Sequence, residues 1–388
     1  MYTHETDTIF DADGKLSRKV VQFRRDLHRI PELDRQLPET TAYLKNHLSA
    51  LPCEIIDITN AGFCAFFRAG KTKQDTIAFR TDMDALPIEE TNDFDFRSEH
   101  PGCMHACGHD GHMSIMLGFA SWVSENLDTL PKNVLLIFQA AEETTGGAKD
   151  FCSSTIFDDY HVEAVYGIHL WPNYPKGTVI CRQGDFMAST IVFLIDILGK
   201  STHVGTYKEG IDALEAGAEF VSRVYEMEKT ALPEDIHRLL RIGRFESGKT
   251  ANIVPANAQI EGTLRTYNEE IRETLWANMN EIANDIETKT GAKFRLRHSV
   301  PYPAVINPDD LFHRAKTAID AARFPFLEPE NPLVLAEDFG CYGKVRPALF
   351  MHLGTGINAM LHSGNYTIDE DVLIDGVRIF RLILESYQ

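Results

Sequence analysis

The apolar run at residues 133–139, NVLLIFQ, most constrains the fold, because a half-buried strand would alternate apolar and polar residues. An uncharged run of this length is typical of a central strand that is covered on both faces. The segment 162–171, VEAVYGIHLW, is a second such strand, nearly continuous in apolar residues apart from Glu163 and His169. Helical patterns occupy 15–30 and 112–127. Strands that alternate with helices predict an α/β fold with a mixed, mostly parallel sheet covered by helices.

The pattern changes at about Met187, where the order becomes strand, helix, strand, strand, helix, strand. This βαββαβ order is that of a ferredoxin-like α+β sandwich. We therefore expect residues 187–297 to form a small inserted domain, and residues 1–186 and 298–388 to form one discontinuous main domain. The segments that carry this prediction are 190–200, 210–228, 237–247, 258–267, 269–287 and 293–300.

Composition excludes several classes of partner. The formal net charge is −19, and no basic stretch offsets it, so neither nucleic acid nor an anionic membrane is expected to bind. No apolar run reaches 18 residues, and residues 1–14 lack the pattern of a signal peptide. The seven cysteines have no CxxC spacing, which favours a reduced, cytoplasmic location.

Side chains that bind metals gather at the predicted strand ends and on one short motif. The motif is HACGHDGH, residues 105–112. Asp82, Asp84, the Glu142–Glu143 pair and His169 each follow an apolar strand. Because ligands of open parallel sheets bind at the carboxyl ends of the strands, these side chains should converge on the loop that holds Cys107 and His109.

The convergence predicts a dinuclear metal site. Cysteine sulfur, histidine nitrogen and carboxylate oxygen are the ligands of zinc and similar cations. Five ligands exceed the needs of one catalytic cation but suit two cations that share a ligand, for which Cys107 is the candidate. The other four are His109, Glu143, His169 and His362. Glu142 would then be the general base that takes a proton from a metal-activated water.

Each of these residues also has an ordinary structural explanation. Asp110 could cap a helix that starts at Gly111, with the histidines exposed. His169 could be a hydrogen-bonded core residue near Trp171, and AEETTGG could be a solvated turn. Two functional alternatives remain as well: Cys107 as a nucleophile, and a non-catalytic metal-dependent binding or scaffold protein.

Nine motifs, in the same order along the chain, resemble those of the aminoacylase and hippurate-hydrolase family of metallo-amidohydrolases. That family includes indoleacetyl-amino-acid hydrolases, and it is related to the dizinc aminopeptidases and carboxypeptidases. The motifs are RRDLHRIPEL, RTDMDALPI, HACGHDGH, QAAEE, GIHLWP, GKSTHVG, ANIVPANAQIEGTLRT, AEDFG and HSGNY. They extend over nearly the whole chain. The resemblance implies a dizinc-peptidase-like main domain with an inserted lid that also mediates dimerisation. It implies that Cys107, His109, Glu143, His169 and His362 are the metal ligands and that Glu142 is the general base.

The resemblance also implies residues outside the metal site. His203 would polarise the substrate carbonyl, in relatives from the neighbouring subunit, while Asn252 and Arg265 would bind the amino-acid carboxylate. Relatives have a ligand histidine where this chain has Arg80, so His109 would replace it and Asp82 would orient a ligand. Asp84 and Asp110 are competing candidates for that orienting role.

The expected activity is hydrolysis of the amide bond of N-acyl-L-amino acids, with Zn, Mn, Co or Ni as the two divalent cations and a homodimer or homotetramer as the assembly. A dipeptidase or carboxypeptidase of the same superfamily is the alternative. The chain departs from the family at Ser201-Thr202 and Thr144-Thr145, where glycines are usual. These stiffer loop residues are expected to affect the acyl preference rather than the mechanism.

Overall fold

The structure is a computed structural model that describes residue 11 and residues 14–58, 60–70 and 75–388. The prediction that the chain begins without a signal peptide therefore concerns residues that lie largely outside the described ones. Two compact units divide the chain. The first contains 1–186, 306–331 and 338–388, and the second contains 187–305 and 332–337. The inserted domain thus extends beyond the predicted end at residue 297 and includes a short later segment.

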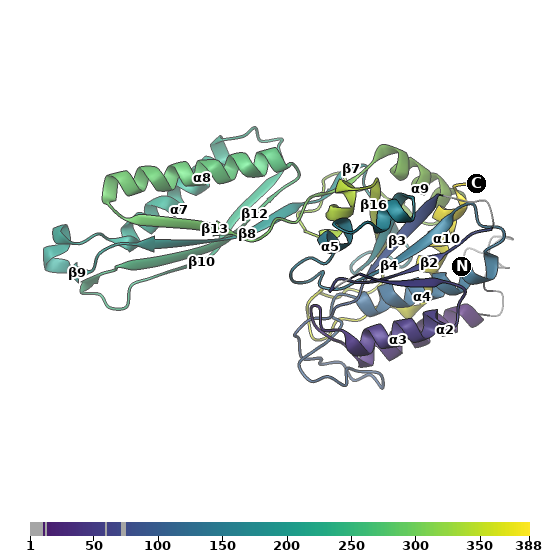
Figure 1. Cartoon of the computed structure of the whole chain (residues 1–388). Coiled ribbons are helices and arrows are strands. Elements are labelled where there is room, and N and C mark those ends of the chain that lie inside the picture. Colours follow the sequence, from purple (N-terminus) through teal and green to yellow (C-terminus); the bar gives the residue numbers. More distant parts are fainter. Residues whose placement is uncertain (1–10, 12–13, 59, 71–74) are drawn as a thin grey trace. The chain divides into compact units, whose positions relative to one another are not determined.

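The first unit is built on an eight-stranded sheet with the order β1-β2-β4-β3-β5-β16-β6-β15 (Figure 1). The central pairs β4–β3, β3–β5 and β5–β16 are parallel, whereas β1–β2, β2–β4 and β16–β6 are antiparallel. This is the mixed, mostly parallel sheet that the apolar runs predict. The strands are β1 (Glu54–Ile58), β2 (Gly62–Phe67), β3 (Thr76–Asp82), β4 (Asn133–Gln139), β5 (Val162–Trp171), β6 (Val179–Ile180), β15 (Phe326–Leu327) and β16 (Ala348–Gly354).

Helices cover both faces of this sheet, and consecutive residues of β3 show how. Phe79 packs its ring at 4.7 Å from Phe119 and at 4.9 Å from Phe380, which lie on α4 and α10. Arg80 points to the opposite face and bonds Asp338 of η2. The helices of this unit are α2 (Lys15–Arg29), α3 (Pro38–Leu48), α4 (His109–Asn126), α5 (Ala148–Cys152), α6 (Ile156–Asp159), α9 (Asp309–Ala321), η2 (Asp338–Lys344), η3 (Glu370–Val372) and α10 (Leu373–Glu385).

The second unit has the predicted βαββαβ order and a four-stranded antiparallel sheet, β10-β12-β8-β13. Two helices pack on one face of it, and Asp212 and Asn268 cap their N-termini through side-chain oxygens. This is a ferredoxin-like arrangement. Its elements are β8 (Ser189–Leu198), α7 (Ala213–Thr230), β10 (Arg238–Ser247), β12 (Asn257–Thr266), α8 (Glu269–Thr290) and β13 (Lys293–His298), with β9 (Thr202–His203), η1 (Val204–Glu209) and β11 (Ile253–Val254) beside them. The chain enters after β7 (Gly184–Met187) and leaves through β14 (Val305–Asn307).

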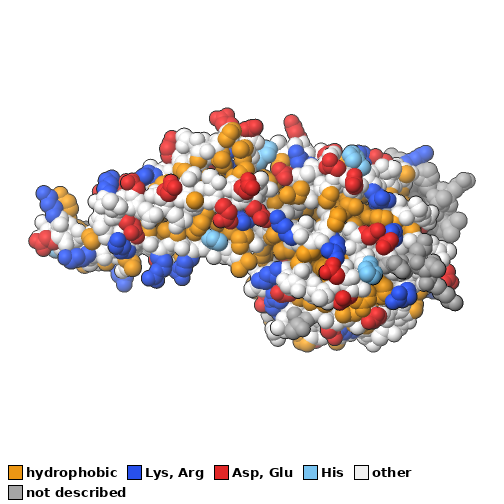
Figure 2. All heavy atoms as spheres, turned by 45° about the horizontal axis from the view of Figure 1, so that its top comes forward, with side chains coloured by type: hydrophobic (Ala, Val, Ile, Leu, Met, Phe, Trp, Pro, Cys, Tyr) orange, Lys and Arg blue, Asp and Glu red, His pale blue; other side chains and the backbone are white. Residues whose placement is uncertain are grey.

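The surface shows no segregation of charge on the face that Figure 2 draws: basic and acidic side chains are interspersed there. Within the described part of the chain, no helix combines the length and the apolar character needed to cross a membrane.

Candidate metal centre

Cys107 lies in the loop before α4, and His109 is the first residue of that helix. Gly108 precedes the helix with a φ of 87°, and a Cβ at this position would lie 2.9 Å from the hydroxyl oxygen of Tyr366. Both conditions favour glycine, because other residues rarely adopt this backbone conformation. The helix begins at His109 rather than at Gly111, and Asp110 lies in its first turn without capping it. His109 and His112 are buried, in contrast to the structural alternative that would expose them.

The turn after β4 delivers the two glutamates. Ala141, directly before them, has a φ of 61°, a conformation that costs energy for a residue with a side chain. The Asp84 carboxylate accepts hydrogen bonds from the peptide nitrogens of Glu142 at 2.9 Å and Glu143 at 3.1 Å. Asp84, which follows β3, therefore fixes the turn that carries the predicted base and a predicted ligand.

Two histidines complete the group. His169 lies near the end of β5, two residues before its last residue Trp171, and its Nε2 atom lies 3.4 Å from the sulfur of Cys107. His362 lies on a loop with a φ of 60°, and its peptide nitrogen donates to Ala106 at 2.9 Å, which ties the two loops together. The Nε2 atom of His362 lies 3.2 Å from a carboxylate oxygen of Glu143.

The five predicted ligands thus lie in one place and divide into overlapping groups, within which the possible ligand atoms lie within 4.8 Å of one another. One group is Cys107, His109 and His169, and another is Cys107, Glu143 and His362. Cys107 belongs to both, as a shared ligand would. Glu142 joins His109 and Glu143 in a third group.

An unpaired buried atom shows that this set suits a cation. His109 Nε2 is buried without a hydrogen-bond partner. It lies 3.8 Å from Glu143 Oε1, the same oxygen that lies 3.2 Å from His362 Nε2. Buried polar groups are normally paired, since each unpaired one costs about 1–3 kcal/mol. A divalent cation between a histidine nitrogen, a carboxylate and a thiolate would satisfy these atoms, and the donor types are those of zinc and similar metals.

Burial sets the protonation of the two innermost ligands. It raises the pKa of the Cys107 thiol well above its ordinary value, and the carboxylates of Glu143 and Glu142 act in the same direction. Burial lowers the pKa of His169, which keeps this ring neutral as a metal ligand must be. A cysteine nucleophile needs the opposite environment, one that lowers the thiol pKa. The Cys107 thiol therefore becomes a thiolate, whether as ligand or as nucleophile, only when a positive charge lies beside it.

The hydrogen bond that orients His109 is made to Asp84, a competing candidate for the orienting role, and not to Asp82. His109 Nδ1 donates to the backbone carbonyl of Asp84 at 2.7 Å, so Asp84 orients this ligand. The Asp82 carboxylate lies 3.8 Å from His109 Nε2 and instead bonds His112 Nδ1 at 2.7 Å. Burial raises the pKa of Asp84 to about 7, although the His109 ring and the two peptide N–H groups favour its charged form.

Sequence reasoning assigned no role to a buried polar network on the sheet face beneath Asp82. Arg80 bonds Asp82 at 2.8 Å, Gln139 at 2.9 Å and Asp338 at 2.9 Å. Asp338 also accepts from Gln139 and from the peptide nitrogen of Ala148. An arginine inside an otherwise apolar strand was the available signal, because a buried charge needs partners.

The three predicted substrate-binding residues all lie in the second unit. His203, on β9, is exposed, and its Nδ1 atom accepts from the peptide nitrogen of Gly205 at 3.0 Å. Asn252 is exposed in the turn before β11. Arg265, on β12, is half-buried; it donates to the backbone oxygen of Val334, while its Nε atom has no partner.

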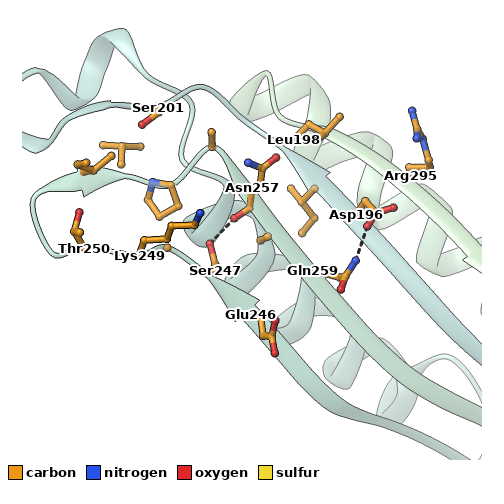
Figure 3. A pocket seen from close by; sticks show the side chains of 17 residues that line it. Asp196, Leu198, Ser201, Glu246, Ser247, Lys249, Thr250, Asn257, Gln259 and Arg295 are labelled. Atoms are coloured by element: carbon orange, nitrogen blue, oxygen red, sulfur yellow. Dashed lines mark hydrogen bonds between the residues drawn. The ribbon is translucent and has the colours of Figure 1, made fainter.

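The second unit also contains a pocket of about 690 Å³ between the ends of β8 and β12 and the segments around β11 (Figure 3). Two hydrogen bonds brace its wall, one from Gln259 to Asp196 at 2.9 Å and one from Ser247 to the backbone oxygen of Asn257 at 2.8 Å. The described residues that line it do not include His203, Asn252 or Arg265. The pocket nevertheless adjoins two of them, because its lining residue Ile253 follows Asn252 and pairs with His203 between β11 and β9.

Comparison with known proteins identifies the family. The model of the peptidase family M20/M25/M40 matches residues 78–386. An uncharacterized hydrolase of Staphylococcus epidermidis is 33% identical over 377 residues, which are 95% of this chain and 98% of that protein.

Solved structures agree with this assignment. The Bacillus subtilis YXEP protein, a dinuclear metal-binding peptidase of the M20 family, is 30% identical with a TM-score of 0.83, over 96% of this chain and 98% of that one. Aminopeptidase PepT of Bacillus cereus is 17% identical with a TM-score of 0.75, over 96% and 98% of the two chains, and shows a shared fold. On these matches and on the ligand groups, the chain belongs to the peptidase family M20/M25/M40 and is a metal-dependent hydrolase of that family.

Proposed function

We propose that this hydrolase cleaves the amide bond of N-acyl-L-amino acids, releasing a free amino acid and a carboxylic acid. The observation that carries the proposal is the buried, unpaired Nε2 atom of His109, which faces Glu143 Oε1 at 3.8 Å beside the shared Cys107. Two divalent cations, Zn, Mn, Co or Ni, would be held by Cys107, His109, Glu143, His169 and His362. When bound, such cations polarise a carbonyl group and lower the pKa of a water molecule.

The protein's own groups would handle the protons. Glu142 takes a proton from the attacking water and later delivers it to the departing amino-acid nitrogen. It can do so because its backbone nitrogen is fixed by Asp84 and its carboxylate lies in one group with His109 and Glu143. The presence of this base beside the ligands favours catalysis over a non-catalytic metal-binding protein.

The second unit would recognise the substrate. Arg265 and Asn252 would bind the amino-acid carboxylate, and His203 would stabilise negative charge on the carbonyl oxygen. We also propose that this unit joins subunits into a homodimer or homotetramer and that the partner subunit supplies His203. All seven cysteines are free, which fits our proposal of a cytoplasmic location.

A substrate panel tests this function. Purified protein is assayed with N-acetyl, N-benzoyl and N-succinyl amino acids and with dipeptides, while its metal content is measured on the same sample. We expect turnover of acyl-amino acids, loss of turnover with a chelator, and recovery with zinc, manganese, cobalt or nickel. Turnover of dipeptides alone would favour the dipeptidase alternative, and no turnover with two bound metals would favour a binding protein.

Subunit sharing has its own test. A His203→Ala chain and a Glu142→Ala chain are each expected to be inactive, and mixing them should restore part of the activity, because a mixed dimer contains one complete site. Absence of recovery after mixing, under conditions where subunit exchange is shown by mass, would contradict the sharing.

A further inference from the structure

His112 lies in the same motif as two metal ligands, but the proposed function gives it no part. Its side chain is 3% exposed, and both ring nitrogens have partners. Nδ1 lies 2.7 Å from a carboxylate oxygen of Asp82, and Nε2 lies 2.8 Å from the peptide nitrogen of Leu170. Leu170 directly follows the ligand His169, so His112 contacts the backbone of the strand end that carries this ligand.

The partners of His112 determine which ring nitrogen carries the proton. The peptide N–H of Leu170 can only donate, so Nε2 of His112 must accept and is unprotonated. The proton of the neutral ring is therefore on Nδ1, which donates to Asp82. The same reasoning applies to His169, whose Nδ1 lies 2.8 Å from the carbonyl oxygen of Leu170. Because that oxygen can only accept, His169 Nδ1 is protonated and its Nε2, next to Cys107, is available to a cation.

These bonds form one continuous series from the ligand into the polar network. The backbone of Leu170 accepts from His169 and donates to His112. Asp82 accepts from His112 and from Arg80, which in turn bonds Asp338. Asp82, Arg80 and Asp338 are at most 2% exposed. In such a buried series each group has few alternative hydrogen-bond partners, so the orientation of one group constrains the orientation of the next.

We infer that His112 is a positioning residue: protonated on Nδ1 and held by Asp82, it fixes the Leu170 backbone and so presents Nε2 of His169 to the metal site. The inference rests on the proposed function insofar as His169 is taken as a ligand. Partners that orient a metal ligand commonly change metal affinity by about 10- to 100-fold when they are replaced.

The proton position is tested first, on unaltered protein. Protein labelled with ¹⁵N-histidine is loaded with zinc, and long-range ¹H–¹⁵N NMR spectra are recorded, with the His112 signals identified by their absence from a His112→Asn variant. We expect His112 to be protonated on Nδ1 alone. A proton on Nε2, or on both nitrogens, would overturn the inference whatever the enzyme's activity.

Metal affinity is tested next, with variants that separate the two contacts. His112→Asn places its amide where it can donate to Asp82 but cannot reach Leu170, whereas His112→Gln can accept from Leu170 and loses the Nδ1 donor. We expect His112→Asn to weaken the binding of one of two cobalt ions by about 10- to 100-fold in chelator competition, and to change the visible spectrum of bound cobalt. The loss of cobalt affinity in His112→Gln should be smaller than in His112→Asn.

The matched control is His105→Asn, because His105 is as buried as His112 but neither of its ring nitrogens has a partner. Its cobalt affinity and spectrum should match those of unaltered protein. Unchanged affinity in His112→Asn, or an equal loss in His105→Asn, would overturn the inference. These outcomes differ from a failure of the proposed function, in which the unaltered protein itself would bind no cobalt or hydrolyse no acyl-amino acid.

Discussion

Two neighbouring residues of α4, His109 and Asp110, enter two largely buried clusters that differ in how their polar atoms are paired. His109 belongs to the group of candidate metal ligands that we call the metal-ligand cluster (Cys107, His109, Glu143, His169 and His362), where the Nε2 atom of His109 has no hydrogen-bond partner. Asp110 belongs to a cluster that we call the paired-charge cluster (Arg24, Arg25, His28, Glu90, Asp110 and Glu370), where opposite charges meet directly.

The paired-charge cluster satisfies its members from within the chain. Asp110 accepts from Arg24 at 3.1 Å and from His28 at 2.8 Å, and the other ring nitrogen of His28 bonds Glu90 at 3.1 Å. Burial opposes the charge on Asp110, but Arg24 and His28 outweigh it and hold the pKa of this carboxyl well below its usual range. Buried ionisable groups alone therefore do not mark a functional site; what distinguishes the metal-ligand cluster is that several metal-binding side chains converge on one place around an unpaired ring nitrogen.

The largest expected effect is a loss of catalytic turnover, which should follow from a change beside the metal-ligand cluster but not from a change in the paired-charge cluster. Glu142→Gln should lower turnover by at least about 100-fold, because the amide cannot accept the proton from water, while metal content and Tm stay the same. Its matched control is Glu90→Gln in the paired-charge cluster, which should lower Tm and leave turnover per folded molecule unchanged. Steady-state kinetics, metal analysis and thermal unfolding measure all three quantities. A Glu142→Gln variant with ordinary turnover would contradict the assignment of the base.

Metal removal should affect only the metal-ligand cluster. A bound cation at 1,000 times its Kd stabilises the folded state by about 4 kcal/mol, so a chelator should lower the Tm of the unaltered protein. Cys107→Ser, which loses the shared ligand, should show a much smaller shift, whereas His28→Gln should keep the full shift. Differential scanning calorimetry with and without chelator checks this. Equal shifts in unaltered protein and Cys107→Ser would argue against Cys107 as a ligand.

Breaking the paired-charge cluster should cost stability rather than function. His28→Gln leaves Asp110 and Glu90 without the cation between them, and removal of one member of a buried ion pair commonly costs about 3–5 kcal/mol. Urea unfolding of metal-free protein should show this loss, while cobalt affinity remains unchanged. A variant as stable as the unaltered protein would show that the other contacts suffice, Arg24 for Asp110 and the donors Asn92 and Ser98 for Glu90.

The smallest expected effect is the pH dependence of that same cluster. Burial opposes the charged form of His28, but hydrogen bonds to Asp110 and Glu90 outweigh it and raise its pKa above 6.5. A raised pKa contributes stability that is complete below the unfolded-state value and is lost as the pH rises through the folded-state value. The stability difference between unaltered protein and His28→Gln should therefore be largest at pH 6 and shrink toward pH 9. A difference that grows with pH would contradict a charged His28.

The sequence alone determined much of the fold and the kinds of ligand. Short apolar runs in alternation with helical patterns indicate buried strands, and the residues that follow such strands lie at one edge of a parallel sheet. This is why Glu142, Glu143 and His169 could be predicted to meet Cys107 and His109. The βαββαβ order likewise identified the inserted domain, although its end at Val305 depends on packing rather than on pattern.

Only the tertiary structure decided which neighbour each polar group pairs with. Asp110 bonds Arg24 and His28 of α2, more than 80 positions away in the sequence, and not the start of its own helix. His109 takes the backbone oxygen of Asp84, which leaves Asp82 to His112. Burial patterns follow from local composition, but hydrogen-bond partners depend on distances of a few tenths of an ångström between distant segments, and no spacing of residues along the chain encodes those distances.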